Sequence, residues 1–430
     1  MKKYLLLLFL FIGFSIYGLA QSASLENLLF ELPDVIFKEI EPVGSYEKAY
    51  ELQVKQLIDH NDSSKGYFYQ RAYLSHKGFD CPTVIVTQGY TVRRNRISEL
   101  AGFLNANQLD LEHRYFGESC PDSLDYTYLN LEQATADLHH INQLFKEIYK
   151  GKWLSTGASK GGATTIFYRY FYPNDVDVSV PYVAPINRER EDSRIYEFLD
   201  TVGSKECHAK IRAFQRRMLK EENKVLPLVE MYANGARLSF TYMTIQEAYE
   251  YTVMEYPFAF WQYGKPCDEI PGHKAPISDA LDYLIKISDL FLFSDKGIDT
   301  YLSHYYQAAS EMGYYGYRTE NFKGLLKTLP TDHHPYAALV PDCIPVHFDG
   351  KVLKGVNEWL KTDANKMIYL YGALDTWSST GVPPNDKVDA VWFYMKGKDH
   401  ATANIKNMTP EEKQKFVSTL ERWLGMTINE

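Results

Sequence analysis

Apolar and polar residues alternate along the first part of the chain in patterns that predict a β-sheet. Two alternating stretches fill residues 50–74, and a polar segment at 61–66 joins them, which is typical of a β-hairpin. Residues 83–87 (TVIVT) form an unbroken β-branched run, as in a strand buried on both faces. Residues 109–114 predict another strand, and we expect a helix at about residues 94–105 between these two strands.

Strand and helix patterns then alternate through the middle of the chain. Residues 131–150 repeat apolar side chains at helical spacing. Residues 152–170 indicate a buried strand, a tight turn and an apolar helix, and residues 177–185 indicate one more strand. This alternation predicts an α/β fold, with a mostly parallel sheet and helices on both faces.

The pattern changes after this last strand. Residues 187–329 contain charged helical segments without a clear strand, which indicates a helical insertion. Strand patterns resume at residues 366–371 and 391–395, and an amphipathic helix is expected at 410–425. The expected organisation is a sheet core in two parts with a helical cap domain between them: residues 21–186, 187–334 and 335–430.

The first twenty residues have the features of a secretory signal peptide. MKK is a positively charged start, residues 4–19 are almost entirely apolar, and small residues precede a cleavage point expected after Ala20. No second apolar span follows. We therefore expect an exported protein, periplasmic or extracellular, with no membrane contact once residues 1–20 are removed.

Composition narrows the classes of partner. The net charge is −9 at neutral pH, which argues against binding to nucleic acid or to an anionic membrane. Aromatic residues make up 15% of the chain, including 34 tyrosines. Such a content suits either a wide, hydrogen-bonding cleft or simply an aromatic core, and the sequence leaves both open.

The five cysteines allow two disulfides and one free thiol in an oxidising compartment. Cys81 and Cys120 flank two consecutive predicted strands and form one plausible pair. Cys207 and Cys267, both in the middle third of the chain, form another.

No metal or cofactor site is predicted. Neither a C-x-x-C motif nor a histidine cluster with the spacing of metal ligands occurs in the sequence. His333 and His334 fall in a polar loop and are expected to be a solvated pair.

The motif GASKG, residues 157–161, carries the first candidate for chemistry. It matches G-x-S-x-G between a predicted strand and a predicted helix, where the serine of a sharp turn serves as a nucleophile. Ser159 is therefore the candidate nucleophile. The alternative is a glycine-rich turn in which the serine only caps the helix.

A serine nucleophile needs a base and an acid that orients the base, and both are present at later strand ends. Asp375 follows one late strand and His400 follows the next. The order Ser159, Asp375, His400 is that of the α/β-hydrolase triad. Taken singly, Asp375 could be a turn residue and His400 a solvated histidine; Asp399 is a rival acid, although sequence neighbours rarely face each other.

The oxyanion of an acyl-transfer intermediate needs two N–H donors. One is expected from Lys160, the residue after the nucleophile, and the other from Gly89 or Tyr90, which follow an early strand. Adjacent residues at a helix start diverge by about 100°, so the Lys160 ammonium is expected to be incidental or structural and not part of a Ser-Lys dyad.

Several segments resemble a family of serine peptidases. The strings QLIDH, YFYQRAYL, LEHRYFGES, LNLEQATADL, GASKGG, QAASEMGYYGY and GALDTW are similar to those of lysosomal Pro-Xaa carboxypeptidase and dipeptidyl peptidase II. Lysine after the nucleophile is closer to their secreted bacterial relatives of the tripeptidyl aminopeptidase type. The resemblance implies an α/β-hydrolase core with a helical cap, and a triad of Ser159, Asp375 and His400.

This resemblance has consequences for two other motifs. The sequence departs from the lysosomal members at GASKGG and at TQGY, which leaves their preference for proline open. Glu112, Arg114 and Glu118 belong to EHRYFGES, and we expect a buried ionic network that braces the loop beside the site.

The expected function is an exported serine exopeptidase that acts on peptides and releases short peptides, with tripeptides implied by the resemblance, from free N-termini. A terminal ammonium requires a carboxylate in a desolvated place. Glu311 in QAASEMGYYGY is the first candidate and Glu255 the second, although either could be an exposed helical glutamate. The alternatives are a carboxylesterase or lipase of the same fold and a catalytically silent peptide-binding relative. The sequence indicates no oligomeric state.

Overall fold

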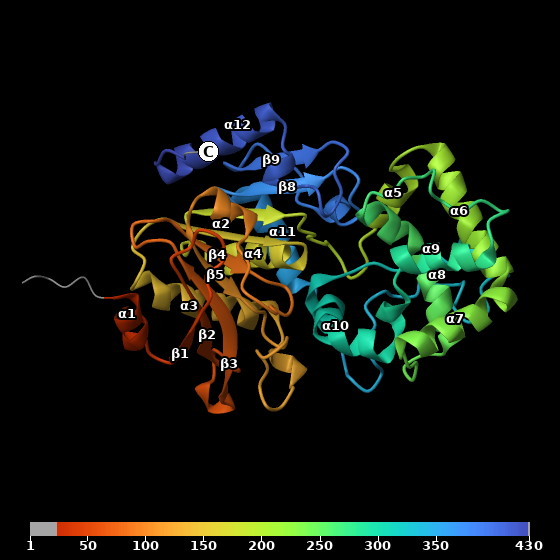
Figure 1. Cartoon of the computed structure of the whole chain (residues 1–430), viewed down its shortest axis with the longest axis horizontal. Helices are drawn as coiled ribbons and strands as arrows, with labels where there is room; N and C mark the ends of the chain where they lie inside the picture. The colour runs from red at the N-terminus through yellow and green to blue at the C-terminus, as the bar shows by residue number, and fades with distance from the viewer. Residues whose placement is uncertain (1–23, 429–430) are drawn as a thin grey trace, which may run out of the picture.

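The chain folds into a sheet lobe and a helical lobe (Figure 1). This computed structural model describes residues 24–428, so the expected signal peptide at residues 1–20 lies outside the described residues. Helix α10 (Asp295–Gln307) lies where the two lobes meet.

The sheet lobe contains a single sheet of nine strands among the described residues, in the order β1-β2-β3-β5-β4-β6-β7-β8-β9. Along this order, each neighbouring pair from β1 to β5 is antiparallel. Each neighbouring pair from β5 to β9 is parallel. The strand bounds are β1 (Val35–Ile40), β2 (Lys48–Leu57), β3 (Tyr67–His76), β4 (Thr83–Thr87), β5 (Asn107–Leu111), β6 (Trp153–Ala158), β7 (Val178–Tyr182), β8 (Ile368–Gly372) and β9 (Val391–Met395). The mostly parallel sheet confirms the predicted α/β class.

The local patterns account for most of these strands. The predicted hairpin is confirmed as β2 and β3, and TVIVT is confirmed as β4, all of whose residues are buried. Strand β1 was not predicted. It is an edge strand whose residues are all at least partly exposed, with Lys38 and Glu39 adjacent, so it lacks a clean alternation of apolar and polar residues.

Helices cover both faces of the sheet. Helices α2 and α12 contribute to a core on one face, and α1, α3, α4 and α11 pack on the other. Their bounds are α1 (Leu25–Glu31), α2 (Glu99–Phe103), α3 (Leu131–Lys146), α4 (Lys160–Phe171), α11 (Lys351–Thr362) and α12 (Pro410–Leu424). Helix α2 is shorter than predicted because the hydroxyl of Ser98 accepts the N–H of Ala101 and caps the helix start.

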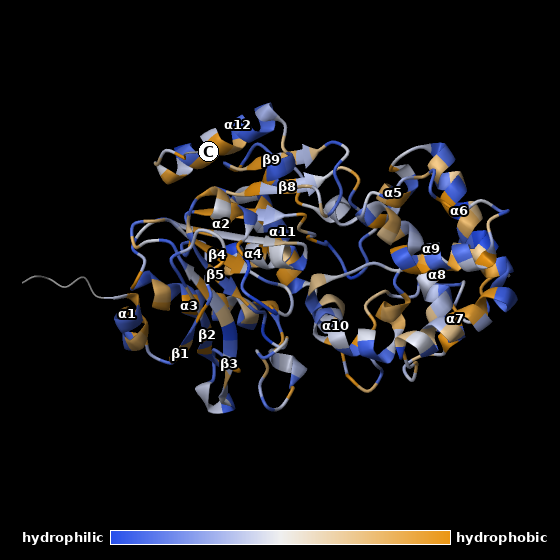
Figure 2. Ribbon diagram, in the orientation of Figure 1, coloured by the Kyte–Doolittle hydropathy of each residue, from blue (hydrophilic) through white to orange (hydrophobic). Residues whose placement is uncertain are grey.

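The helical lobe is formed by the part of the chain between β7 and α11. Its helices are α5 (Arg194–Thr201), α6 (Lys205–Lys220), α7 (Glu222–Ala236), α8 (Ile245–Gln262), α9 (Ile277–Ile287) and α10. Polar and apolar residues alternate along α6 and α7 (Figure 2), and the apolar faces join a core cluster that also takes in Trp377 of the sheet lobe. Within residues 24–428, no helix combines the length and the hydropathy needed to cross a membrane.

One of the two predicted disulfides is confirmed and the other is wrong. Cys207 and Cys267 are bonded within the helical lobe. Cys81 and Cys120 are both free thiols. Cys81 precedes β4 whereas Cys120 follows β5, and these neighbouring strands are parallel, so the two cysteines lie toward opposite ends of the strands.

Candidate active site

Ser159 lies at the sharp turn between β6 and α4. Its φ of 56° and ψ of −126° fall in a region that residues other than glycine rarely adopt, and such strain is typical of a nucleophile elbow. Glycines let the helix approach the strand: a Cβ at Gly157 would lie 2.4 Å from the carbonyl oxygen of Gly161, and one at Gly162 would lie 2.6 Å from that of Tyr182. The partly exposed serine lines a cavity.

Asp375 and His400 meet at one end of the parallel strands. Asp375 follows β8, and His400 follows the neighbouring strand β9. His400 Nδ1 lies 2.9 Å from Asp375 Oδ2. The carboxylate of Asp375 is fully buried and also accepts the N–H groups of Trp377 and Ser378, each at 3.1 Å, and the Ser378 hydroxyl at 2.6 Å. These donors hold the carboxylate toward the imidazole ring.

Asp399, the rival acid, shapes its own loop. Its Oδ1 accepts the N–H of Ala401 at 3.0 Å, the N–H of Thr402 at 2.9 Å and the Thr402 hydroxyl at 2.7 Å. Of the two acids, it is therefore Asp375 that contacts the imidazole of His400.

Ser159 and His400 are not hydrogen-bonded to each other in this structure. Among the hydrogen bonds of residues 24–428, none joins these two side chains, and His400 Nε2 has no partner. The backbone N–H of His400 donates to the backbone carbonyl of Gln262 at 3.0 Å, and Gln262 lines the same cavity as Ser159. Catalytic hydrogen bonds are often long in free enzymes and tighten only when substrate binds.

A cavity of about 190 Å³ extends from Ser159 into the helical lobe. Both lobes contribute to its wall, which is rich in aromatic side chains. These are Tyr90, Phe258, Tyr263, Phe293, Tyr301, Tyr305, Tyr314, Tyr315, Tyr317 and Trp377. Three of them come from GYYGY, residues 313–317, and seven of the 34 tyrosines in the chain line this cavity. The aromatic content therefore serves the cleft in part, and most tyrosines lie elsewhere.

Glu255 on α8 places a carboxylate in this cavity. It is 5% exposed, and its Oε2 accepts the hydroxyls of Tyr315 at 2.9 Å and Tyr317 at 2.8 Å. Burial raises the pKa of Glu255 to about 7, against the two tyrosine hydrogen bonds, which lower it. No lysine, arginine or histidine among the described residues forms an ion pair with Glu255, and its Oε1 accepts no hydrogen bond there.

Glu311, the first candidate from the sequence, does not line this cavity. Its Oε2 accepts the N–H of Leu131 at 2.7 Å, at the first residue of α3, where the helix dipole favours a carboxylate. Burial raises the pKa of Glu311 to about 7 as well. Glu311 therefore joins the two lobes, and of the two glutamates only Glu255 shares the cavity with Ser159.

The residues expected to supply the oxyanion donors lie together. Tyr90 and Lys160 both line the cavity next to Ser159. Gly89 packs against the elbow so closely that a Cβ there would lie 2.6 Å from Lys160 Cβ. The side chain of Lys160 is not incidental: it is 2% exposed and donates from Nζ to the carbonyl oxygen of Gly89 at 2.8 Å. Burial lowers the pKa of this amine well below its usual range.

The EHRYFGES motif forms two buried ion pairs with partners that the sequence did not reveal. Arg71 Nη2 lies 2.6 Å from Glu112 Oε1, and the fully buried Arg114 binds Asp137 with two contacts of 2.7 Å. Glu118 also pairs with Arg71, but its side chain is 60% exposed, so it is not the buried member that we expected.

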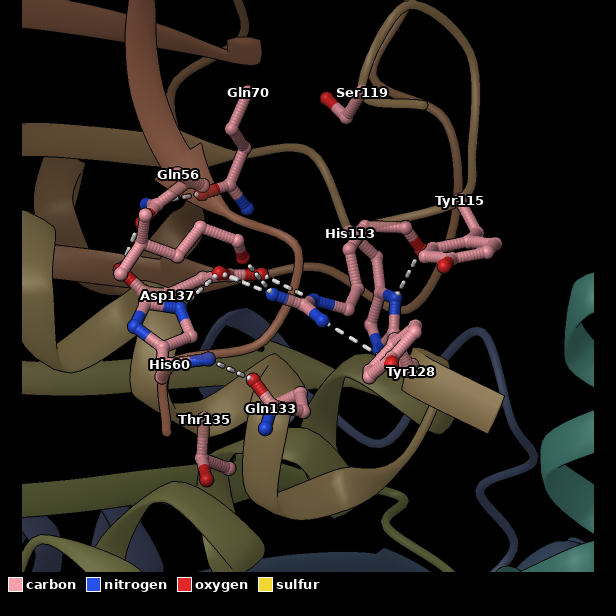
Figure 3. Close-up of polar contacts among 12 residues, drawn as sticks. Gln56, His60, Gln70, His113, Tyr115, Ser119, Tyr128, Gln133, Thr135 and Asp137 are labelled. Carbon is pink, nitrogen blue, oxygen red and sulfur yellow. Dashed lines mark hydrogen bonds and ion pairs between the residues drawn. The ribbon is translucent and has the colours of Figure 1, made fainter. Parts of the chain in front are cut away.

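Asp137, the acid of the second pair, contacts both Arg114 and His60 (Figure 3). His60 Nε2 lies 2.7 Å from Asp137 Oδ1, and Arg114 also donates to three backbone carbonyls. Asp137 is on α3, within the LNLEQATADL segment, but only the fold brings it to Arg114. This network ties the hairpin to α3.

His304 on α10 is a cavity residue that the sequence analysis missed. It is buried, its Nε2 lies 3.3 Å from the hydroxyl of Tyr314, and burial lowers its pKa to about 3. A single histidine in a helical pattern carries no signal that separates it from a core residue.

The predicted polar histidine loop shows two different environments. His333 is exposed and pairs with Asp332, whereas His334 is partly buried and lies 2.7 Å from Glu191. Within the described part of the chain, no group of three or more histidine, cysteine, aspartate or glutamate residues could hold a metal ion.

A strained serine between a parallel strand and a helix, with a histidine and an acid at later strand ends, defines a serine hydrolase of the α/β-hydrolase class. The model of the family described as PS-10 peptidase S37 matches residues 20–429. The chain belongs to this family and is a serine peptidase.

Several known proteins are similar to this chain. The chain is 31% identical over 415 residues to a prolyl tri/tetrapeptidyl aminopeptidase of Streptomyces mobaraensis, covering 95% of this chain and 86% of the relative. It is 27% identical to a probable serine protease of Arabidopsis thaliana, covering 51% and 49% of the two chains. Among solved structures, proline iminopeptidase of Mycobacterium smegmatis aligns with a TM-score of 0.42 and 10% identity, over 87% of this chain and 97% of the other.

Proposed function

We propose that the protein is an exported exopeptidase that removes short peptides, tripeptides or tetrapeptides, from free N-termini by a Ser-His-Asp acyl-enzyme mechanism. One observation carries this proposal: Glu255 is a buried carboxylate without a cationic partner among the described residues, and it lines the same cavity as Ser159. The name of the Streptomyces relative supports the product length.

In the proposed mechanism, His400 Nε2 takes the proton of the Ser159 hydroxyl as the oxygen attacks the scissile carbonyl carbon. The Asp375 contact at 2.9 Å keeps the Nδ1 proton in place and stabilises the imidazolium that forms. The N–H groups of Lys160 and of Gly89 or Tyr90 stabilise the oxyanion. His400 then protonates the leaving amine, and water hydrolyses the acyl-enzyme by the reverse proton transfers.

Glu255 is proposed to bind the terminal ammonium of the substrate. An unpaired buried carboxylate is unfavourable, and a cation that enters the cavity relieves this cost. The hydroxyls of Tyr315 and Tyr317 hold Oε2 in place, so Oε1 stays available to the ammonium. An enclosed anchor of this kind counts residues from the N-terminus, which is what an exopeptidase requires.

Export is proposed from two features. The first twenty residues have the composition of a signal peptide. The Cys207–Cys267 disulfide also supports an oxidising compartment, since such bonds are rare in the cytosol.

We expect Glu255→Gln to lower kcat/KM for free-amine peptides by about 10- to 100-fold, since a hydrogen bond to a charged group contributes about 1.5–3 kcal/mol. The measurement compares a peptidyl amide with its N-acetylated twin. The wild type should prefer the free amine, and the variant should lose this preference without losing turnover of the acetylated peptide.

Glu311→Gln is the matched control, because Glu311 is a partly buried glutamate that also has a raised pKa but does not line the cavity. It should retain the preference for the free amine. Equal cleavage of both peptides by the wild type would contradict the aminopeptidase proposal. Cleavage of acyl esters alone would indicate an esterase, and no hydrolysis of either would indicate a silent peptide-binding relative.

The preference for free amines should depend on pH. Burial raises the pKa of Glu255 to about 7, so its ammonium-binding form is present above pH 7 and is lost as pH falls through 7. The ratio of kcat/KM for the free peptide to that for its acetylated twin should therefore fall below pH 7. Taking the ratio cancels the protonation of His400, which affects both peptides. A ratio that is flat from pH 5 to 7.5 would exclude Glu255 as the anchor.

A further inference from the structure

The loop at residues 88–92, which follows β4, is held by a buried ionisable side chain on each of two sides. This loop contains Gly89 and Tyr90, the two candidates for the second oxyanion donor. Lys160 contacts the start of the loop, and Glu112 contacts its end.

On the first side, the Lys160 amine has an unusual environment. Its Nζ donates to the Gly89 carbonyl at 2.8 Å and lies 5.6 Å from the ring centroid of Tyr90 and 5.0 Å from that of Phe116. Among residues 24–428, no carboxylate forms an ion pair with it. A buried lysine without a carboxylate is costly, so its interactions with this carbonyl and these rings are the ones that offset its burial.

The bond to Gly89 sets the direction of a donor. The carbonyl of Gly89 and the N–H of Tyr90 belong to the same planar peptide group, so fixing the oxygen fixes the plane in which the N–H lies. The Tyr90 carbonyl accepts the N–H of His113 at 3.3 Å, whereas no hydrogen bond among the described residues uses the Tyr90 N–H as donor. Tyr90 lines the cavity and Gly89 does not, which favours the Tyr90 N–H as the oxyanion donor.

On the other side, Glu112 holds the end of the loop. Its Oε1 accepts the N–H of Val92 at 2.9 Å and pairs with Arg71. Its Oε2 accepts the N–H and hydroxyl of Ser119 at 3.1 and 2.8 Å. The carboxylate is fully buried, and the next loop fits tightly around it, since a Cβ at Gly117 would lie 2.2 Å from Oε1.

We propose that Lys160 and Glu112 are positioning residues for the oxyanion hole, which together hold the 88–92 loop in register with the nucleophile elbow. This inference rests on the proposed acyl-enzyme mechanism. Lys160 then has two roles: its backbone N–H is one oxyanion donor, and its side chain orients the peptide group that supplies the other. The distance between the two oxyanion donors is thereby fixed by Lys160 alone, the residue next to Ser159.

Lys160→Met tests the proposal, because methionine fills a similar volume without a donor. Outright loss of one oxyanion donor lowers kcat by about 100- to 1000-fold, so a misoriented donor should lower it by about 10- to 100-fold. KM for a free tripeptidyl amide should change less than about twofold. Affinity for a peptidyl boronate, which forms a tetrahedral adduct with the serine, should fall by the same factor as kcat.

Arg169→Met is the matched control. Arg169 is a buried cation on the same helix α4, and it donates to the carbonyls of Val176 and Asp177, away from the cavity. The control should lower Tm while kcat and boronate affinity stay within about twofold of the wild type. A lower Tm in Lys160→Met with unchanged kcat and boronate affinity would mean a purely structural role and would overturn the proposal.

Glu112→Gln approaches the loop independently and serves if Lys160→Met does not fold. It should lower kcat and boronate affinity together, measured at temperatures well below its Tm. If both variants keep wild-type kcat, the positioning proposal fails while the peptidase proposal stands. A wild type that neither hydrolyses peptides nor binds the boronate would instead refute the proposed function itself.

Discussion

Ser159→Ala should reduce peptide hydrolysis by roughly five to six orders of magnitude, to the residual level that binding and the oxyanion hole supply. The strained elbow presents this serine to the cavity, and among the described residues that line the cavity Ser159 is the only serine or threonine. Alanine removes only the oxygen, and the backbone bond from the Ser159 N–H to the Tyr182 carbonyl stays available, so folding should be unchanged. The measurements are kcat/KM and covalent labelling by a fluorophosphonate.

Ser155→Ala is the control for this change. Ser155 lies on the same strand, β6, is fully buried, and pairs with the hydroxyl of Ser179 away from the cavity. That variant should label and hydrolyse as the wild type does. A wild-type protein that never labels, or a Ser159→Ala variant that still turns over, would rule out the elbow serine as nucleophile.

The second large effect is expected for Asp375→Asn, which should lower kcat by about 10⁴-fold. Asparagine preserves the size of the side chain but can offer an N–H to His400 Nδ1, which favours the wrong tautomer, and it no longer stabilises the imidazolium. Activity in both proteins should also fall at acid pH, because His400 must be neutral to act as base. Kinetics at the pH optimum of the wild type measure the effect.

Asp399→Asn separates the two acids. Asp399 makes its contacts to Ala401 and Thr402 within its own loop, so its substitution should cost far less activity than that of Asp375. A larger loss in Asp399→Asn would show that the imidazole is oriented by the neighbouring acid during turnover.

Much of this protein is encoded in short stretches of sequence. The hairpin, the TVIVT strand and the strands near residues 368 and 391 all follow from side-chain patterns with a period of two or from unbroken apolar runs. The elbow follows from glycines at fixed offsets around Ser159, because only glycine permits the close approach of helix and strand. These features depend on residues within one or two turns of each other, which is why a sequence can reveal them.

The order of the candidate triad is also a sequence property. In a parallel sheet, the loops that follow the strands all emerge at the carboxyl ends of the strands, so residues placed directly after strands meet there. The contact between Asp375 and His400 agrees with this rule. The edge strand β1 shows where prediction from side-chain patterns fails. An exposed strand needs no apolar face, so its sequence has no periodic pattern.

Other features were decided only by the tertiary structure. Whether Glu255 or Glu311 shares the cavity with Ser159 depends on how α8 and the turn at residues 308–312, after α10, pack. Both glutamates lie in similar apolar, aromatic stretches of sequence. The ion pairs of Arg71 with Glu112 and of Asp137 with Arg114, and the contact of Lys160 with Gly89, join positions that lie 23 to 71 residues apart. The sequence shows which residues can carry a charge. The effect of a buried charge depends on the groups that surround it, and these come together only when the chain folds.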